Sequence, residues 1–573
     1  MILATIRPGA ASALLSALLS RLPSLSQASA ASALALALLV LRQLASNLGR
    51  RRALIAQSLP FLPHTSPLHL LRGHLNLLAA PEGAIEASVK LVRELGSVFV
   101  TTGILGRPTL WIADPVALKV LMVTRAKRAR VERSLEGRKL VAQIVGWGSL
   151  LTLEGAEHRS HRKILDPAFN LKNLTPLVPV VSHITDRLIS ILAAHAGEPI
   201  DFVPLSLGVT LNVIGQSATE TDFDALNQSA PSDLFSACKA VFSTADQTPL
   251  AHMRRFVPLI RHLPLRGNWE YAASLARVRS AVDAVVNKYA LSATPTMAPT
   301  AKVHMAAGPE NVSSSGSTRP KRVVSLIATL QTILRSHTIS NQDMSDELMG
   351  VLLAGHETTA ISFSMAVHEL GRHPDVLRAL YDELKMHDPD ELFSGETGYT
   401  KLAELPLLNA VINETLRMHS PIGFAGRQLV GDDGMELPLE DGRVVRIEKG
   451  QRMMIPYNAF GLLPSVWGPT ANQWQPSRWF LLATAGNQSH LDLSMDPSLS
   501  RKKAVPSLFV PFGAGSHMCI GRKMALLELR VLIARMVLAF EWESMQEKVK
   551  KRSLVTAGPV QVLIRLKGRD GRS

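Results

Sequence analysis

The stretch that decides the fold is Phe512-Gly513-Ala514-Gly515-Ser516-His517-Met518-Cys519-Ile520-Gly521, which places a cysteine inside a glycine-lined loop. An apolar helical segment follows it, from about Arg522 to Phe540. Backbone N–H groups in such a loop and the positive end of the helix dipole both favour a charged sulfur. The pattern therefore predicts a thiolate at Cys519.

Two other interpretations of this loop are open. A lone cysteine is commonly a small buried hydrophobic residue, and glycines can mark only a tight turn. Gly513-x-Gly515, after the strand-like residues 507–511, also suggests a dinucleotide-binding loop. That loop needs a third glycine where this chain has Met518, and too few residues follow Gly521 to complete a nucleotide-binding domain. The dinucleotide interpretation therefore fails.

The spacing Phe-x-x-Gly-x-His-x-Cys-x-Gly resembles the haem-binding signature of the cytochrome P450 family. The resemblance implies haem b with Cys519 as the axial thiolate of the iron, Phe512 packed near the sulfur and Gly521 beside it. Thiolate ligation favours O–O cleavage. The implied fold is mainly α with small β-sheets, in a single large catalytic domain.

A second motif lies in the long helical pattern from Asp346 to Gly371. Ala354-Gly355-His-Glu357-Thr358 resembles the oxygen-activating helix of the same family. We expect the small residues to let the helix pass close over a flat ligand, and Glu357 and Thr358 to relay protons. An ordinary surface helix is the alternative, but a glycine inside an apolar helix costs about 1 kcal/mol relative to alanine.

A charged network is predicted from two further segments. Glu414-Thr-Leu-Arg417 places an acid and a base on one helical face, which alone is commonly a weak surface bridge. Trp474-Gln-Pro-Ser-Arg478-Trp479 resembles the family's Pro-Glu-Arg-Phe box, with serine where glutamate is commoner. The resemblance implies that Arg478 joins Glu414 and Arg417 in a structural triad.

Four cationic or potentially cationic side chains are expected around the two haem propionates. His158 and Arg162, four residues apart, replace a Trp-x-x-x-Arg pattern of the family, and Arg427 and His517 stand where it has propionate-binding residues. A plain basic surface helix is one alternative for residues 155–163. A zinc site at His158 and His161 is another, but no additional ligand cluster supports it.

Composition bounds the class of protein. The chain has 573 residues, of which 46% are hydrophobic, and its mean hydropathy is +0.14. These values indicate a folded protein with a large core that contacts a membrane. The two cysteines, Cys238 and Cys519, exclude a disulfide framework and indicate a reducing compartment.

The net charge of +15 is unevenly distributed. Residues 1–81 contain seven arginines and no acidic residue, since the first acid is Glu82. This distribution fits membrane targeting better than nucleic-acid binding, for which no recognition motif is present. We therefore expect no nucleic-acid partner.

The sequence divides into a leader, a hinge and a catalytic domain. Residues 1–59 are predicted to be a membrane anchor or targeting segment with a basic linker, residues 60–67 a proline-rich hinge, and residues 68–567 the haem-thiolate domain. Within that domain, residues 293–322 form a low-complexity loop insertion and residues 482–507 a second loop insertion.

The leader predicts a single-pass membrane protein. Leu22–Leu41 is about long enough to span a bilayer, and Arg42 and Arg50–Arg52 follow it. By the positive-inside rule the catalytic domain is then cytosolic, which suggests the endoplasmic reticulum. The alternative is a mitochondrial transit peptide, because the leader is rich in arginine and serine and free of acids.

The resemblance implies a monooxygenase that inserts one oxygen atom of O2 into a hydrophobic small molecule, such as a fatty acyl chain, a terpenoid or another secondary metabolite. The chain has no flavin or iron–sulfur motif, so its electrons are expected from an NADPH-cytochrome reductase or through a small electron carrier. The alternative function is a reductase-independent haem-thiolate isomerase or dehydratase. The Glu357-Thr358 pair argues against it, because such enzymes need no proton relay.

Overall fold

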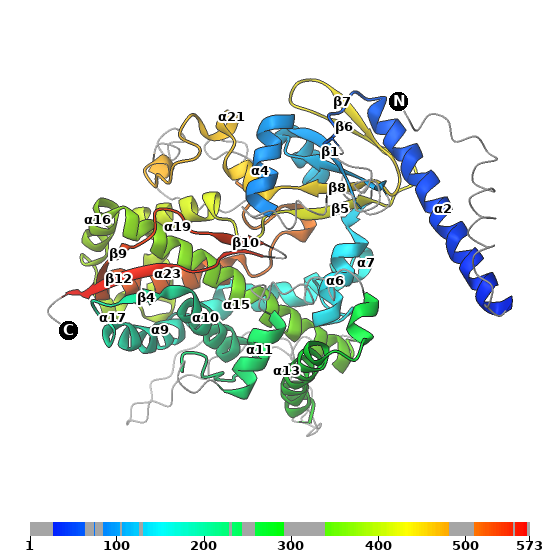
Figure 1. Ribbon diagram of the computed structural model, residues 1–573. Helices are drawn as coiled ribbons and strands as arrows, with labels where there is room; N and C mark the ends of the chain where they lie inside the picture. Colours follow the sequence, from blue (N-terminus) through cyan, green and yellow to red (C-terminus); the bar gives the residue numbers. More distant parts are fainter. Residues whose placement is uncertain are drawn as a thin grey trace, which may run out of the picture. The chain divides into compact units, whose positions relative to one another are not determined.

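The structure is a computed structural model (Figure 1) that describes residues 27–63, 74, 84–103, 106–124, 130–227, 232–242, 258–291, 339–480, 509–553 and 556–569. Both predicted insertions, the first 26 residues and part of the hinge lie outside these ranges. The chain forms two units: Met1–Leu75 with Val100–Thr109, and Asn76–Phe99 with Leu110–Ser573.

Helices predominate in the described residues, which confirms the predicted fold class. The α-helices are α2 (Gln27–Ile55), α4 (Ala84–Leu95), α5 (Pro115–Lys119), α6 (Leu135–Val145), α7 (Gly155–Leu165), α8 (Leu171–Leu174), α9 (Leu177–Ala193), α10 (Phe202–Thr219), α11 (Asp233–Phe242), α13 (Arg266–Leu291), α15 (Asn341–Arg372), α16 (Pro374–Leu384), α17 (Pro389–Leu392), α18 (Gly395–Glu404), α19 (Pro406–Met418), α20 (Tyr457–Gly461), α21 (Pro464–Trp467) and α23 (Arg522–Ala539). Short turns of other helix types are η3 (Val120–Thr124), η4 (Asp166–Phe169), η5 (Pro258–His262) and η7 (Gly515–His517).

The strands are short. They are β1 (Val98–Thr102), β2 (Pro108–Ile112), β3 (Val131–Arg133), β4 (Pro199–Asp201), β5 (Ala425–Leu429), β6 (Met435–Pro438), β7 (Val444–Ile447), β8 (Arg452–Ile455), β9 (Phe540–Ser544), β10 (Lys551–Ser553), β11 (Ala557–Pro559) and β12 (Leu563–Gly568). In the larger unit, β5 pairs antiparallel with β3 and with β8, and β12 lies between β4 and β9. The β3–β5 pair matters for the site, because it sets Arg133 opposite Arg427.

The helix α15 is the centre of the larger unit. The Ser340 hydroxyl accepts a hydrogen bond from the Asp343 N–H and so caps its first turn, and Pro374 follows its end. It packs against α10, α13, α23 and β9 (Figure 1). Its length and its largely buried surface make it the element on which the other helices are arranged.

Gly355 has a different role from the one expected. A Cβ added there would lie 2.8 Å from Ile214 of α10, so the missing side chain allows α10 to approach α15. The neighbouring Ala354 is instead exposed. Of the two small residues, only Ala354 therefore lies on the accessible side of the helix.

One helical segment of the described part, Leu171–Ala193, is long and apolar enough to cross a membrane, and 44% of its apolar window is buried. It comprises α8 and α9, and α9 packs against α10 and α23 in the core. The predicted anchor at Leu22–Leu41 lies partly outside the described residues, since α2 begins at Gln27.

Candidate active site

The loop around Cys519 is closed by backbone hydrogen bonds. The Cys519 N–H donates to the Phe512 carbonyl at 2.8 Å, and the Met518 N–H donates to the Gly515 carbonyl at 3.2 Å. Gly515 has a φ of +70°, and a Cβ there would collide with the Met122 carbonyl oxygen. Glycine is therefore required at this position both by backbone conformation and by space.

Cys519 lies directly before α23, and its thiol is accessible. Desolvation by the surrounding protein raises the pKa of the Cys519 thiol, while the Gly521 N–H and the charges of Arg162 and Arg522 act in the opposite direction. A metal-bound thiol is deprotonated outright, because the metal charge dominates. The loop therefore offers an accessible sulfur with three features that stabilise its anion.

Cys238 provides the contrast within the same chain. It is fully buried in α11, and desolvation raises the pKa of its thiol to about 12. Neither a neighbouring cation nor a helix N-terminus offsets that effect. Only Cys519 has the surroundings of a ligand thiolate.

Five charged or polar side chains form a cradle beside the Cys519 loop: Arg133, Glu154, His158, Arg427 and His517. Glu154 Oε1 accepts from Arg133 Nε at 2.6 Å, and Glu154 Oε2 lies 3.2 Å from His517 Nε2. The rings of His158 and His517 lie with their centres 4.3 Å apart. Burial and the nearby cations lower the pKa of His158 to about 3, so this ring is neutral at pH 7.

The structure places Arg162 beside the cysteine loop. Its guanidinium donates to the Met518 carbonyl and to Asp166 Oδ1, the latter at 2.8 Å. Arg162 thus braces the residue before Cys519, while His158 on the same helix faces His517. His158 and Arg162 both line the groove between α7 and the cysteine loop.

Arg133 and Glu154 are the site residues that sequence reasoning missed. Neither belongs to a recognised motif, and the available signal was only that a carboxylate directly precedes the glycine that begins α7. The Arg133–Arg427 pairing depends on the register of β3 and β5, and the two residues are 294 positions apart in the sequence. Local sequence does not encode such a register.

The residues present fit a haem group. Arg427 is 6% exposed, yet its one resolved hydrogen bond goes to the Gly426 carbonyl at 3.2 Å, and no carboxylate of the described residues pairs with it. His517 Nδ1 is buried and has no hydrogen-bond partner among those residues. A buried charge of this kind needs an anion. A flat ligand with two carboxylates and an iron near Cys519 would satisfy all three groups.

The described residues contain no cluster of three His, Cys, Asp or Glu side chains that could hold a metal ion. His161 contacts Glu347 Oε1 at 2.8 Å, whereas His158 faces His517, so the two rings contact different partners. The zinc alternative for this pair therefore has no support in the described part of the chain.

The accessible turn of α15 carries the predicted proton-relay residues. Thr358 Oγ1 donates to the Ala354 carbonyl at 2.8 Å and is partly accessible, while Glu357 is buried. His356, the residue before Glu357, is buried on another side of the helix, where the centre of its ring lies 5.5 Å from that of Phe242. Thr358 is therefore the polar side chain of this turn that lies on the same accessible side as Ala354.

Glu528 of α23 is a further buried acid next to this turn. It is 2% exposed, it hydrogen bonds with Thr359, and its Oε2 has no partner among the described residues. Burial raises the pKa of Glu528 well above its ordinary value, which favours the protonated form of the side chain. Its contact Thr359 is the residue that follows Thr358 in α15.

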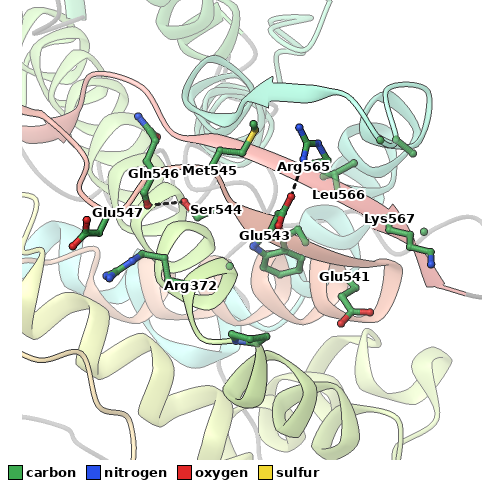
Figure 2. Close-up of a pocket in the computed structure, with 16 residues that line it drawn as sticks. Arg372, Glu541, Glu543, Ser544, Met545, Gln546, Glu547, Arg565, Leu566 and Lys567 are labelled. Atoms are coloured by element: carbon green, nitrogen blue, oxygen red, sulfur yellow. Dashed lines mark hydrogen bonds and ion pairs between the residues drawn. The ribbon is translucent and has the colours of Figure 1, made fainter.

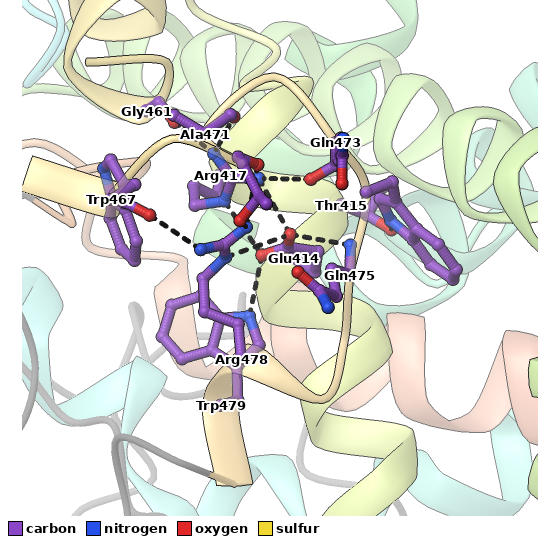
Figure 3. Close-up of polar contacts among 12 residues, drawn as sticks. Glu414, Thr415, Arg417, Gly461, Trp467, Ala471, Gln473, Gln475, Arg478 and Trp479 are labelled. Carbon is purple, nitrogen blue, oxygen red and sulfur yellow. Dashed lines mark hydrogen bonds and ion pairs between the residues drawn. The ribbon is translucent and has the colours of Figure 1, made fainter. Parts of the chain in front are cut away.

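The predicted network around Glu414 is assembled (Figure 3). Glu414 accepts two hydrogen bonds from Arg417, at 2.7 and 2.8 Å, and one from Arg478 at 3.4 Å. Arg417 Nη1 donates to the main-chain carbonyls of Gly461 and Ala471, and Nη2, which also donates to Glu414, donates to that of Gln473. This network fixes the segment between α19 and Trp479, which lies on the same core as Phe512.

A second groove in the described residues lies away from this loop. Figure 2 shows it between β9 and the ends of α15 and α16, with a volume of about 1010 Å³. Its lining mixes acids such as Glu543 with bases such as Arg565, and it includes neither Cys519 nor any cradle residue. We therefore assign the active site to the cysteine loop and not to this groove.

Comparison with known proteins gives a consistent result. A family model described as Cytochrome P450 matches residues 63–567. Cytochrome P450 monooxygenase 205 of Postia placenta is 27% identical, over 82% of this chain and 84% of its own. Cytochrome P450 monooxygenase FUM15 of Gibberella moniliformis is 26% identical, over 78% of this chain and 76% of its own. Ganoderic acid synthetase CYP5150L8 of Ganoderma lucidum is 26% identical, over 78% of this chain and 82% of its own.

Proposed function

The chain belongs to the cytochrome P450 family, and on that premise we propose that it is a haem b monooxygenase acting on a hydrophobic small molecule. The observation that carries the proposal is the Cys519 loop, where an accessible sulfur receives the Gly521 N–H at the start of α23. The reaction takes O2, two electrons and two protons, inserts one oxygen into a C–H bond and releases the other as water.

We assign each haem-binding residue to one part of the group: the iron, the ligand sulfur or the propionates. Cys519 would ligate the iron through its sulfur, Phe512 and Gly521 would lie beside that sulfur, and Arg427 with His517 and His158 would bind the propionates. Arg162 holds the loop through the Met518 carbonyl. When bound, the haem iron supplies oxygen activation, and the thiolate ligand favours cleavage of the O–O bond.

The chain itself must deliver the protons. We assign Thr358, on the accessible side of α15, as the proton donor, with two buried acids as proton holders: Glu357, its neighbour in the chain, and Glu528, which contacts Thr359. Because Thr358 currently donates to the Ala354 carbonyl, a turn of its hydroxyl is enough to redirect the proton. Both acids are buried, which keeps bulk water from exchanging with the relay.

Replacing Thr358 by alanine is expected to uncouple the reaction. NADPH and O2 continue to be consumed, but product formed per NADPH falls at least about tenfold, because general acid catalysis of this kind contributes that much or more. Product and NADPH are counted in the same assay. Thr358→Ser, which keeps the hydroxyl, should remain coupled, and stoichiometric product from the alanine variant would contradict the relay.

Electrons are proposed to come from a separate NADPH-cytochrome reductase, directly or through a small electron carrier. A groove of about 620 Å³ lies between α7 and the cysteine loop and is lined by Arg159, Lys163 and Ser516 among others. Arg159 and Lys163 are exposed and lie one helical turn apart. A cationic surface beside the ligand loop supports docking of an acidic partner there.

Reversing these two charges is expected to weaken reductase binding. In Arg159→Glu/Lys163→Glu the KM for reductase rises about tenfold or more at low salt, because steering by opposite charges is lost. The difference shrinks as salt is added, since exposed charges are screened. Lys239→Glu, an exposed lysine of α11, is the matched control. An unchanged KM in the double variant would place docking elsewhere.

Membrane attachment is proposed through the N-terminal segment. Leu38 and Leu39 of α2 are 54% and 61% exposed, so this helix presents large apolar side chains at its surface. Arg50–Arg52 lie in the same helix, at the end expected to face the cytosol. This supports a single-pass anchor in the endoplasmic reticulum, with mitochondrial targeting as the alternative to be separated by localisation of the tagged full chain.

The proposed function is tested by turnover with candidate hydrophobic substrates, whether fatty acyl, terpenoid or another secondary metabolite. The purified chain is mixed with reductase, NADPH and O2, and oxygenated product is measured against NADPH consumed. Product that depends on NADPH supports the monooxygenase. Product formed from a peroxide without NADPH would instead support a haem-thiolate isomerase or dehydratase.

A further inference from the structure

Two arginines, the partly buried Arg133 and the buried Arg427, lie opposite each other on neighbouring strands of the cradle. Arg133 of β3 and Arg427 of β5 are partners in the antiparallel register. Like charges directly opposite one another destabilise a strand pair, and buried guanidinium groups need an anion. Among the described residues, Glu154 supplies the carboxylate next to this strand pair. It forms an ion pair with Arg133 and not with Arg427.

Glu154 joins three separate elements. Its Oε1 accepts from the Arg133 side chain at 2.6 Å and from the Arg133 main-chain N–H at 3.3 Å, and its Oε2 meets His517 Nε2 at 3.2 Å. Hydrogen bonds and charges from these partners hold the pKa of Glu154 at about 2 against the opposing effect of burial. The carboxylate is therefore ionised and ties β3, the start of α7 and the Cys519 loop together.

Arg133 is further occupied by the main chain. Its terminal nitrogens donate to the carbonyls of Leu150, Leu151 and Leu153, at 3.0, 2.8 and 2.5 Å. Among the described residues, the Arg427 side chain donates only to the Gly426 carbonyl, at 3.2 Å. The two arginines are thus unequal: one is held by a carboxylate and three carbonyls, and the other keeps most of its donors available.

We infer that Glu154 is a positioning residue of the haem cradle. It holds Arg133 and His517 in place and leaves Arg427 as the guanidinium that pairs with a haem carboxylate. The inference rests on the proposed function, since it requires that haem binds here. It adds Glu154 and Arg133 to the residues expected from the sequence, and it leaves only Nδ1 of His517 for a haem carboxylate, because His517 Nε2 already contacts Glu154.

The direction in which haem binding changes when the Glu154 carboxylate is removed tests this role. A carboxylate that merely lies near two propionates repels them, so its removal makes haem bind more tightly. A positioning carboxylate has the opposite effect, because its loss releases Arg133 and the Cys519 loop. Haem release from the full-length, haem-loaded chain to excess apomyoglobin measures this directly, without any substrate or reductase.

In Glu154→Gln we expect haem transfer to be about 10- to 100-fold faster than in the wild type, the size typical of lost support around a metal ligand. Glu157→Gln, which removes an exposed acid three residues further along the chain, should transfer haem at the wild-type rate. Slower or unchanged transfer in Glu154→Gln would overturn the inference.

Two further measurements separate positioning from general loss of structure. If Glu154 acts through Arg133, the Glu154→Gln change has little added effect in an Arg133→Gln background, whereas a full added effect overturns the inference. The reduction potential of the bound haem should rise in Glu154→Gln, because the freed guanidinium stabilises the added electron. An unchanged potential also counts against it.

If Glu154→Gln does not fold, Glu154→Asp replaces it in the same assays. Aspartate keeps the charge but is one methylene shorter, so it cannot reach both partners, and we expect a transfer rate between those of the wild type and Arg133→Gln. A wild-type rate for Glu154→Asp would overturn the inference. A wild-type chain that lacks a thiolate-type spectrum would instead defeat the proposed function itself.

Discussion

Replacing Cys519 by serine is expected to abolish both thiolate ligation and monooxygenation. A serine hydroxyl cannot supply the electron-rich sulfur that favours O–O cleavage, although the loop hydrogen bond from residue 519 to the Phe512 carbonyl is a main-chain contact and can persist. We therefore expect a folded protein in which the red-shifted carbon monoxide spectrum is lost and product formation falls below detection.

Cys238→Ala is the matched control for this change. Cys238 is the other cysteine of the chain, and it is buried in α11 with a thiol pKa of about 12. Its removal should leave the thiolate spectrum intact, at a stability cost of about 1 kcal/mol or less. Loss of the red-shifted spectrum in Cys238→Ala, or its retention in Cys519→Ser, would reject Cys519 as the ligand.

Replacing Arg417 by alanine is expected to give the largest loss of stability. Its side chain has no solvent exposure, makes two hydrogen bonds to Glu414 and three to main-chain carbonyls, and lies over the Trp467 ring at 5.2 Å. Removing one partner of a buried ion pair costs about 3–5 kcal/mol, because the other charge stays buried. Glu414 would retain Arg478 at 3.4 Å as its nearest guanidinium.

Such a loss is a large fraction of the total stability of a typical domain, about 5–15 kcal/mol. We therefore expect Arg417→Ala to accumulate as aggregated or haem-free protein, which is measured by the yield of soluble haem and by the midpoint of thermal unfolding. Arg378→Ala, an exposed arginine of α16, should change that midpoint little. A soluble Arg417→Ala protein with a wild-type midpoint would show that the network is not needed for the fold.

The fold and family could be predicted from the sequence because the motifs are local. The Cys519 loop is a run of turn-forming glycines before an apolar helix, and the helix expected from about Arg522 to Phe540 is α23, Arg522–Ala539. The Glu414–Arg417 pair is also local, being one turn of α19. In these cases residues close in the sequence are sufficient to define the contact.

The rest of the site depends on contacts between distant segments. Arg133 and Glu154 join the site only through strand register and through the approach of α7 to the cysteine loop. Gly355 was expected to face the ligand, but it faces Ile214, because a helical pattern alone does not say which neighbour lies against a given side. Glu528 belongs to an apolar helix whose contact with Thr359 is set by the packing of α23 on α15.

The carbon monoxide difference spectrum of the reduced, haem-loaded wild type shows whether Cys519 ligates the haem iron as a thiolate. We expect a strongly red-shifted Soret band, which is lost in Cys519→Ser and retained in Cys238→Ala. A Soret band at the position typical of histidine-ligated haem, in folded and fully loaded wild-type protein, would contradict it.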